Sequence, residues 1–242
     1  MPVLVVTGTN TEVGKTVVTA AVAATALAGG RSVAVLKAAQ TGVGPDEPGD
    51  AAEVVRLAGA VTPAELARYP EPLAPGTAAR RAGRAPVHPH EIAERAAKLA
   101  TEHDLVLVEG AGGLLVRFDA AGGTLADAAG LLRAPVLVVA SAGLGTLNAA
   151  ELTVRELRGR GLDPVGVVIG SWPATRGSPN AATCRTCRTS PACRCWVAVP
   201  EGAGHLDPTA FRSAAPHWLA PRLEGVWDAE AFHAREAPSR AR

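Results

Sequence analysis

Residues 8–16 read Gly8-Thr-Asn-Thr-Glu-Val-Gly-Lys-Thr16 and lie between an apolar run and a run rich in alanine and valine. The apolar run, residues 2–6, predicts a buried strand, and residues 17–28 have the length and composition of a helix. A strand, a glycine-bearing loop and a helix that opens on Gly-Lys-Thr form the context that a phosphate-binding loop requires. The backbone N–H groups of such a loop and the N-terminus of its helix attract an anion. The stretch therefore predicts a nucleotide site.

Two side chains of this loop have expected roles of their own. Lys15 would bring a positive charge to the β- and γ-phosphates, and the Thr16 hydroxyl could take a place on Mg²⁺. The loop departs from the general GxxxxGK[ST] rule, because Thr9 stands where the first glycine is expected. An ordinary strand–helix turn with a surface lysine is the alternative, and the complete strand–loop–helix context argues against it.

Length and charge limit the class of protein. The 242 residues suit one α/β domain with an ample core. A net charge of +1 gives no electrostatic reason to expect nucleic acid or a membrane surface as a partner. We expect a cytoplasmic protein, because no run is as long as a transmembrane span and the N-terminus lacks a secretory signal pattern.

Continuous apolar runs alternate with helical stretches along the chain, as expected of parallel strands buried on both faces. This order predicts a P-loop NTPase-like, doubly wound, mostly parallel sheet with helices on both faces and ligands at the carboxyl ends of the strands. We expect one domain over residues 1–225, a C-terminal tail over 226–242, and a long surface connection over 69–90. The remaining predicted strands are 32–37, 104–108, 135–140 and 165–169, and the remaining helices are 50–57, 90–101, 125–132 and 147–159.

Charged residues stand where predicted strands end or the next helix begins. Lys37 would face the γ-phosphate and neutralise charge that develops in phosphoryl transfer, although a surface lysine is the alternative. Glu109 occupies the Walker-B position for Mg²⁺, and a purely structural buried glutamate there would be costly. Asp50 could cap its helix, hold Mg²⁺, or do both.

Two further signals are weaker. Thr41 could bind a substrate, but a local turn is the simpler interpretation of a single threonine. Thr146 or Asn148 could cap the helix that follows the fourth strand, and the free N–H groups of that helix would suit a carboxylate. Capping alone remains the alternative for this loop.

Taken together, these residues resemble the dethiobiotin synthetases, the ATP-dependent carboxylases of biotin synthesis. The resemblance extends to about residue 222 in the family's order and spacing, and a threonine in place of the first loop glycine is normal in that family. One departure is Ala38, since the family usually has proline after the lysine. The matching stretches are 7–16, Lys37 with 40–42, Asp50, 108–113, 143–148 and 199–202.

The resemblance implies a homodimeric ligase that acts on 7,8-diaminopelargonate. CO₂, drawn from bicarbonate, would add to one amine to give a carbamate, and ATP would phosphorylate the carbamate. The second amine would then attack the mixed anhydride and close a cyclic urea with loss of phosphate. Because a carbamate oxygen is already a nucleophile, such a site mainly needs positioning and charge neutralisation.

The resemblance also implies a role for each matching residue. Lys15 and Lys37 would be catalytic, and Thr16, Asp50 and Glu109 would hold Mg²⁺. Thr41 and Glu12 would bind the substrate, together with Thr146, Leu147 and Asn148 across the dimer interface. The expected nucleotide-binding residues are Glu12, Val13, Gly14, Lys15, Thr16, Val17, Asp50, Glu109, Gly110, Ala111, Gly112, Gly170, Ser171, Pro200, Glu201 and Gly202.

An ATP-switched, partner-binding ATPase of the partition or division-site type is the alternative function. Such proteins typically carry a second lysine early in the phosphate loop, where this chain has Thr9-Asn10. They also present a basic or amphipathic surface, which is not evident here. An amide-forming synthetase of the cobalamin pathway would need a glutaminase domain with a nucleophilic cysteine, for which neither the length nor the cysteine placement allows.

All four cysteines lie in residues 184–195, as a CxxC followed by a CxC. Four thiolates could form a zinc knuckle, a divergent loop is a second interpretation, and a disulfide is less expected in the cytoplasm. We favour a third interpretation, in which residues 175–196 are translated from a shifted reading frame. Back-translation with G/C-ending codons, read in the neighbouring frame, gives a leucine-bearing helical stretch that runs directly into residues 198–202.

Overall fold

A computed structural model describes residues 2–173, 196–228 and 232. The cysteine-bearing stretch, with its zinc, loop and frameshift interpretations, lies outside the described residues except for Trp196. The described part forms a seven-stranded sheet in the order β4-β2-β6-β1-β7-β8-β9, in which every neighbouring pair is parallel. This is the doubly wound parallel sheet that the strand–helix alternation predicts.

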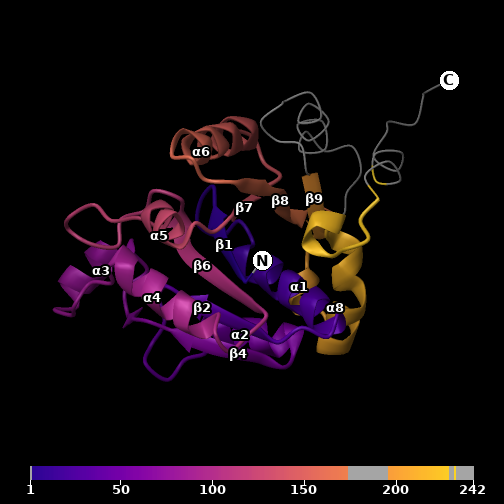
Figure 1. Cartoon of the computed structure of the whole chain (residues 1–242), viewed down its shortest axis with the longest axis horizontal. Coiled ribbons are helices and arrows are strands. Elements are labelled where there is room, and N and C mark those ends of the chain that lie inside the picture. The colour runs from indigo at the N-terminus through magenta and orange to yellow at the C-terminus, as the bar shows by residue number, and fades with distance from the viewer. Residues whose placement is uncertain (1, 174–195, 229–231, 233–242) are drawn as a thin grey trace.

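Helices cover both faces of this sheet (Figure 1). The helices α1, α2 and α8 pack on one face, and α4, α5 and α6 pack on the other. The sheet strands are β1 (Val3–Gly8), β2 (Val33–Lys37), β4 (Val61–Glu65), β6 (Leu105–Gly113), β7 (Val136–Ala140), β8 (Pro164–Trp172) and β9 (Trp196–Pro200). The helices named are α1 (Lys15–Ala28), α2 (Asp50–Ala58), α4 (Pro89–Leu99), α5 (Leu125–Leu132), α6 (Thr146–Gly159) and α8 (Pro208–Ala214).

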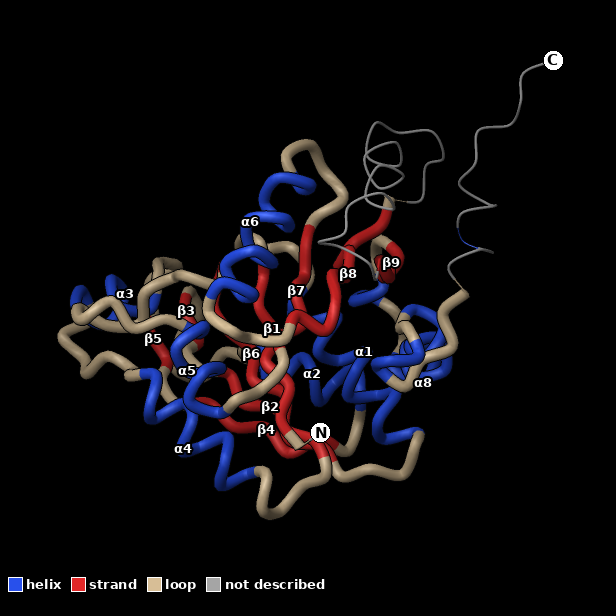
Figure 2. Tube along the Cα trace, turned by 45° about the horizontal axis from the view of Figure 1, so that its top comes forward, coloured by secondary structure: helices blue, strands red, loops and turns tan. Residues whose placement is uncertain are grey.

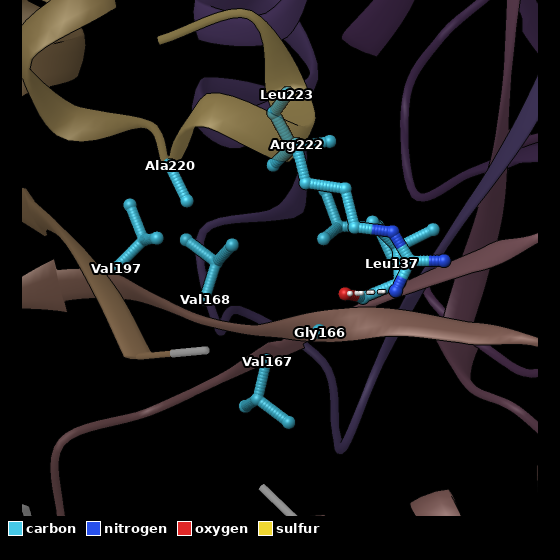
Figure 3. Close-up of a pocket in the computed structure, with 9 residues that line it drawn as sticks. Leu137, Gly166, Val167, Val168, Val197, Ala220, Arg222 and Leu223 are labelled. Carbon is cyan, nitrogen blue, oxygen red and sulfur yellow. Dashed lines mark hydrogen bonds between the residues drawn. The ribbon is translucent and has the colours of Figure 1, made fainter. Parts of the chain in front are cut away.

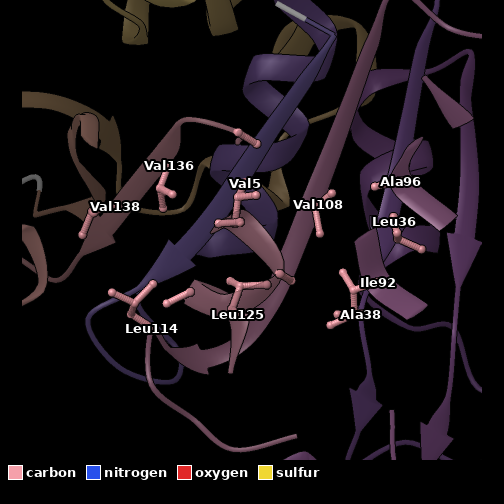
Figure 4. Packing of buried hydrophobic residues seen from close by; sticks show 14 of the residues in the cluster. Val5, Leu36, Ala38, Ile92, Ala96, Val108, Leu114, Leu125, Val136 and Val138 are labelled. Atoms are coloured by element: carbon pink, nitrogen blue, oxygen red, sulfur yellow. The ribbon is translucent and has the colours of Figure 1, made fainter. Parts of the chain in front are cut away.

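The two faces have separate apolar cores, because successive side chains of a strand point to opposite sides. In β1, Leu4 and Val6 pack with the α1 and α2 side, whereas Val5 packs with the α4 and α5 side. Figure 4 shows this second core, where Ile92 of α4 lies near Leu36. Burial on both faces explains why the apolar runs of the sequence are continuous rather than alternating.

The predicted strands and helices within the described residues are all present, with end points that shift by a few residues. The largest shift is in β6, which continues through its glycines to Gly113. Strand β4 was not predicted from the sequence, because Pro63 lies at its centre and only Val61 is buried. Among the described residues it is an edge strand that pairs only with β2, and edge strands are where proline is tolerated in a sheet.

Residues 69–90 are not the purely surface connection that the sequence predicts. Tyr69, Ala78 and Val87 are buried in the core of the α4 and α5 side. The segment includes the short helix α3 (Pro75–Arg81), and a two-stranded parallel sheet joins β3 (Gln40–Thr41) to β5 (Arg68–Tyr69). Figure 2 places α3, β3 and β5 together beside the end of β2. Helix α3 has only seven residues, which is too short to show a helical repeat of apolar residues in the sequence.

Short 3₁₀ helices close the β8 and β9 edge of the sheet: η2 (Ala203–His205), η3 (Ala215–Trp218) and η4 (Pro221–Leu223). In Figure 3, Ala220 and Leu223 face Val168 and Val197, and Arg222 donates a hydrogen bond to the carbonyl of Val165 at 3.2 Å.

Two aromatic residues from the stretch assigned to the C-terminal tail pack against this edge. The ring centroids of Trp227 and Phe232 are 4.6 Å apart, and those of Phe232 and Trp172 are 5.2 Å apart. The amide of Trp227 donates to the carbonyl of Leu219 at 2.9 Å. Within the described residues, no helix combines the length and the apolar character needed to cross a membrane.

Candidate active site

A cavity of about 640 Å³ opens at the carboxyl ends of β1, β2 and β6. Its walls come from the phosphate loop, the ends of β2 and β6, the start of α2, and the segment before α3. Its size is within the range typical of small-ligand sites. The predicted residues that line it are Glu12, Gly14, Lys15, Thr16, Val17, Lys37, Thr41, Asp50, Glu109, Ala111 and Gly112.

A second cavity of about 320 Å³ adjoins the first and shares Glu12, Gly14 and Val17 with it. On its other side lie Gly170 at the end of β8 and Pro200 at the end of β9, so this cavity lies beside the phosphate loop on the β8 side. The two cavities therefore meet at the phosphate loop. The remaining lining residues are Ser171, Gly202, Glu53, Arg56, Ala203, Gly204 and His205.

The backbone of the phosphate loop explains its residue types. Gly14 has φ of 90°, and a Cβ atom there would lie 2.6 Å from the carbonyl oxygen of Gly170. Only glycine fits this left-handed position against a neighbouring backbone. Glu12 also has a positive φ, 57°, whereas Thr9 does not, so the position of Thr9 does not demand a glycine.

Lys15 folds back over the loop, where its Nζ donates to the carbonyl of Asn10 at 3.0 Å. Its amino group is buried, and that burial, together with the nearby positive charge of Lys37, lowers the pKa of Lys15 from its usual value of 10.5. The amino group therefore lies in the loop as a poorly compensated cation, which favours an anionic ligand.

Lys37 is the centre of a charge cluster in which Lys37 and Glu109 are buried and Asp50 is partly exposed. The pairing of β2 with β6 sets Lys37 opposite Glu109, and its Nζ lies 2.9 Å from Glu109 Oε1. The same Nζ lies 2.5 Å from Asp50 Oδ2 and donates to the carbonyl of Gly110 at 3.1 Å. Burial opposes the charge on Lys37, but the attraction of Glu109 and Asp50 outweighs it and raises the pKa of Lys37 above 10.5. Lys37 therefore stays protonated at neutral pH.

Two threonines of α1 complete the contacts of the Glu109 carboxylate. Thr16 Oγ1 donates to Oε1 at 3.0 Å, and Thr19 Oγ1 lies 2.8 Å from Oε2. Thr19 was missed by sequence analysis, although a polar residue one turn after Thr16 on a buried helix face was the available signal. The structure therefore brings Thr16, Asp50 and Glu109 to one place, as the sequence predicts.

These three side chains offer only oxygen atoms, which are the ligands that Mg²⁺ prefers. Among the described residues there is no group of three or more His, Cys, Asp or Glu side chains arranged to hold a metal. Two carboxylates and a hydroxyl nevertheless fit Mg²⁺, because this ion usually keeps several waters and binds phosphates through its remaining positions.

Several predicted residues do not line either cavity. Val13 and Gly110 are buried. Glu201 is exposed, and its backbone amide donates a hydrogen bond to the carbonyl of Trp172. Thr146, Leu147 and Asn148 begin α6 and are likewise absent from the walls of both cavities. Thr146 is 3% exposed, and its Oγ1 has no hydrogen-bond partner among the described residues.

Comparison with known proteins gives close relatives over the whole length. A family model described as an AAA domain matches residues 3–195. The ATP-dependent dethiobiotin synthetase of Streptomyces coelicolor is 73% identical and covers 98% of this chain and 100% of its own length. The protein of the same name from Streptomyces avermitilis is 69% identical with the same coverage, and that from Frankia casuarinae is 55% identical over 97% of this chain and 99% of its own.

Two solved structures show the same fold at low sequence identity. The cell division ATPase MinD of Pyrococcus furiosus has a TM-score of 0.56 and 17% identity, covering 93% of this chain and 99% of its own. The septum site-determining protein MinD of Pyrococcus horikoshii, complexed with Mg-ADP, has a TM-score of 0.53 and 13% identity, covering 98% of this chain and 99% of its own. These likenesses concern the fold alone, whereas the close relatives favour the synthetase hypothesis over the switch ATPase.

Proposed function

The chain belongs to the family of ATP-dependent dethiobiotin synthetases, and we propose that it forms dethiobiotin from 7,8-diaminopelargonate, CO₂ and ATP. The family assignment rests on relatives at 55–73% identity over nearly the whole chain. The observation that carries the proposed chemistry is the Lys37 amino group, which lies between two carboxylates and beside the phosphate loop. This arrangement suits phosphoryl transfer, which needs positioning and charge neutralisation more than a protein base.

The nucleotide would span both cavities. Its phosphates would lie on the N–H groups of the loop and at the N-terminus of α1, with Lys15 beside them. Its nucleoside would occupy the smaller cavity, between Gly170 and Pro200. Thr16, Asp50 and Glu109 would hold Mg²⁺, which when bound supplies positive charge to the β- and γ-phosphates.

Lys37 would stabilise the reacting oxygens. Because its pKa is raised, the amino group keeps its charge in the operating pH range and can offset the negative charge of a carbamate or a transferring phosphoryl group. The buried pairing with Glu109 and the partly exposed pairing with Asp50 hold it in place before the reactants bind. No proton has to be removed from the carbamate oxygen, so Lys37 would act throughout as a cation.

The substrate would lie in the larger cavity, beside Thr41 and Glu12. We propose that its carboxylate is bound by Thr146, Leu147 and Asn148 of a second copy in a homodimer. Support comes from the position of these residues at the N-terminus of the 14-residue helix α6, and from the buried Thr146 hydroxyl that has no partner among the described residues.

Labelled bicarbonate tests the proposed reaction. With [¹³C]bicarbonate, ATP, Mg²⁺ and 7,8-diaminopelargonate, the enzyme should yield one labelled carbon per product molecule, in a product one water lighter than the carbamate. A product without the label, or recovery of unchanged diamine while ATP is consumed, would contradict the proposal.

A further inference from the structure

The two-stranded sheet of β3 and β5 lies beside the start of α2, where no side chain of the preceding residue can cap the helix. The residue before α2 is Gly49, and the helix begins with Asp50 itself. A helix start without a cap leaves N–H groups that need another acceptor. The side chain of Gln40, in β3, supplies it: Gln40 Oε1 accepts from the amide of Asp50 at 2.8 Å.

This contact is partly buried, and neighbouring hydrogen bonds support it. Gln40 is 4% exposed, and its own backbone amide is held by the carbonyl of Ala67 in the connection to β5. From the neighbouring strand, Arg68 Nη1 donates to the carbonyls of Gly44 at 2.8 Å and Glu47 at 2.6 Å. Gln40 and Arg68 thus hold both the loop before α2 and the first amide of that helix.

Gly49 shows how closely the loop lies against these two side chains. A Cβ atom on Gly49 would be 2.7 Å from Gln40 Oε1 and 2.9 Å from Arg68 Nη2. Both of those atoms are close enough that a methyl group would have to displace them. The absence of a side chain at Gly49 therefore permits the contact between Gln40 and Asp50.

We propose that Gln40 is a positioning residue that fixes the Asp50 carboxylate through the hydrogen bond to the Asp50 amide, with Arg68 holding the loop that leads to it. The proposal rests on the metal-binding role given to Asp50 above. Because Asp50 also pairs with Lys37, the same hydrogen bond helps to hold the Asp50 carboxylate against the Lys37 amino group. Residues that orient metal ligands commonly change metal affinity 10- to 100-fold when mutated.

Manganese binding and amide exchange test this role on the full chain. In the presence of β,γ-imido-ATP, Gln40→Leu should raise the Kd for Mn²⁺, followed by electron paramagnetic resonance, by about tenfold. Hydrogen–deuterium exchange at residues 50–53 should become faster in the same variant. Gly49→Ala should change both quantities in the same direction, whereas Gln40→Glu keeps an oxygen acceptor and should restore most of the affinity.

Glu91→Leu is the matched control, because Glu91 accepts the amide of His88 at 2.7 Å at the start of α4 and lines neither cavity. This variant should keep the wild-type Kd for Mn²⁺ and wild-type exchange at residues 50–53. A Gln40→Leu protein with both quantities at wild-type values would overturn the proposal. If the wild-type enzyme forms no labelled product from bicarbonate, the proposed function is contradicted. The comparison of Mn²⁺ affinity and amide exchange between the variants still stands in that case.

Discussion

At Lys37, a single amino group joins β6 to α2, since it contacts the Glu109 carboxylate and the Gly110 carbonyl on β6 and the Asp50 carboxylate on α2. The Lys37→Met variant keeps much of the side-chain volume but removes this charge. We expect kcat for diamine-dependent phosphate release to fall by about a hundredfold or more, since one stabilising donor is typically worth that much in the transition state. Lys98→Met, at an exposed position of α4, is the control and should keep full activity. Wild-type kcat in Lys37→Met would refute the role given to this lysine.

The opposite pKa shifts of the two lysines predict the alkaline side of the pH profile. The pKa of Lys15 is lowered by burial, so its charge is lost below pH 10.5, and kcat/KM for ATP should decline with an apparent pKa below that value. Lys15→Arg should move this decline to higher pH, because a guanidinium stays charged. An unchanged alkaline limb in Lys15→Arg would show that another group titrates.

The two lysines also affect stability with opposite signs. The raised pKa of Lys37 means that its contribution to folding is complete below pH 10.5 and is lost as the pH rises through the folded-state value. The lowered pKa of Lys15 means that the unfolded chain binds more protons between the folded-state value and 10.5, so its unfavourable contribution fades as the pH rises through this window. Urea denaturation across alkaline pH, on Lys15→Met and Lys37→Met, separates the two effects.

The charged residues of the site were easier to predict from the sequence than the polar residues that hold them in place by hydrogen bonds. Lys37 is the last residue of one predicted strand and Glu109 directly follows another, so their placement follows from strand topology. Thr19 and Gln40 were not assigned, because their partners are 90 and 10 residues away in sequence. The helical spacing from Thr16 to Thr19 was a signal for Thr19, whereas no local pattern indicates the contact of Gln40.

Among the elements, α4 offers a direct test of the core on its side of the sheet. Ile92 is fully buried there, near Leu36 and Val108, as Figure 4 shows. Ile92→Ala should lower the free energy of unfolding by about 3 kcal/mol, because it removes buried methyl groups and leaves a cavity. Leu131→Ala, on the exposed face of α5 with the side chain 62% exposed, should change it by less than about 0.5 kcal/mol.

Urea unfolding curves of the two variants measure this difference. Equal and small losses would mean that α4 does not cover the sheet as described.

The strands that the sequence predicted are buried on both faces, and the helices that it predicted are long enough to show a helical repeat of apolar residues. Strand β1 is entirely buried, and its continuous apolar run could not belong to an exposed strand. Strand β4 and helix α3 lack these signals, since one carries Pro63 and the other is seven residues long. Strand β4 is placed by its pairing with β2, and helix α3 is placed by its contacts with β5. Neither contact can be read from the local sequence.

At the scale of the whole molecule, the reading-frame interpretation of residues 175–196 stays a prediction. Resequencing the gene should show one insertion or deletion near codon 174 and a compensating one near codon 196. The composition of this stretch, with its four cysteines, differs from the apolar and acidic composition expected between two strands of the sheet. A clean sequence that agrees with the present one would reject the frameshift and leave the zinc and loop interpretations.

The central claim is that the cleft couples ATP cleavage to ring closure on a diamine. The most direct measurement is phosphate release by the full chain with ATP, Mg²⁺ and bicarbonate, in the presence and absence of 7,8-diaminopelargonate. We expect release only when the diamine is present, and loss of that release in Lys37→Met. Equal release without the diamine, or release stimulated by DNA or lipid instead, would contradict it.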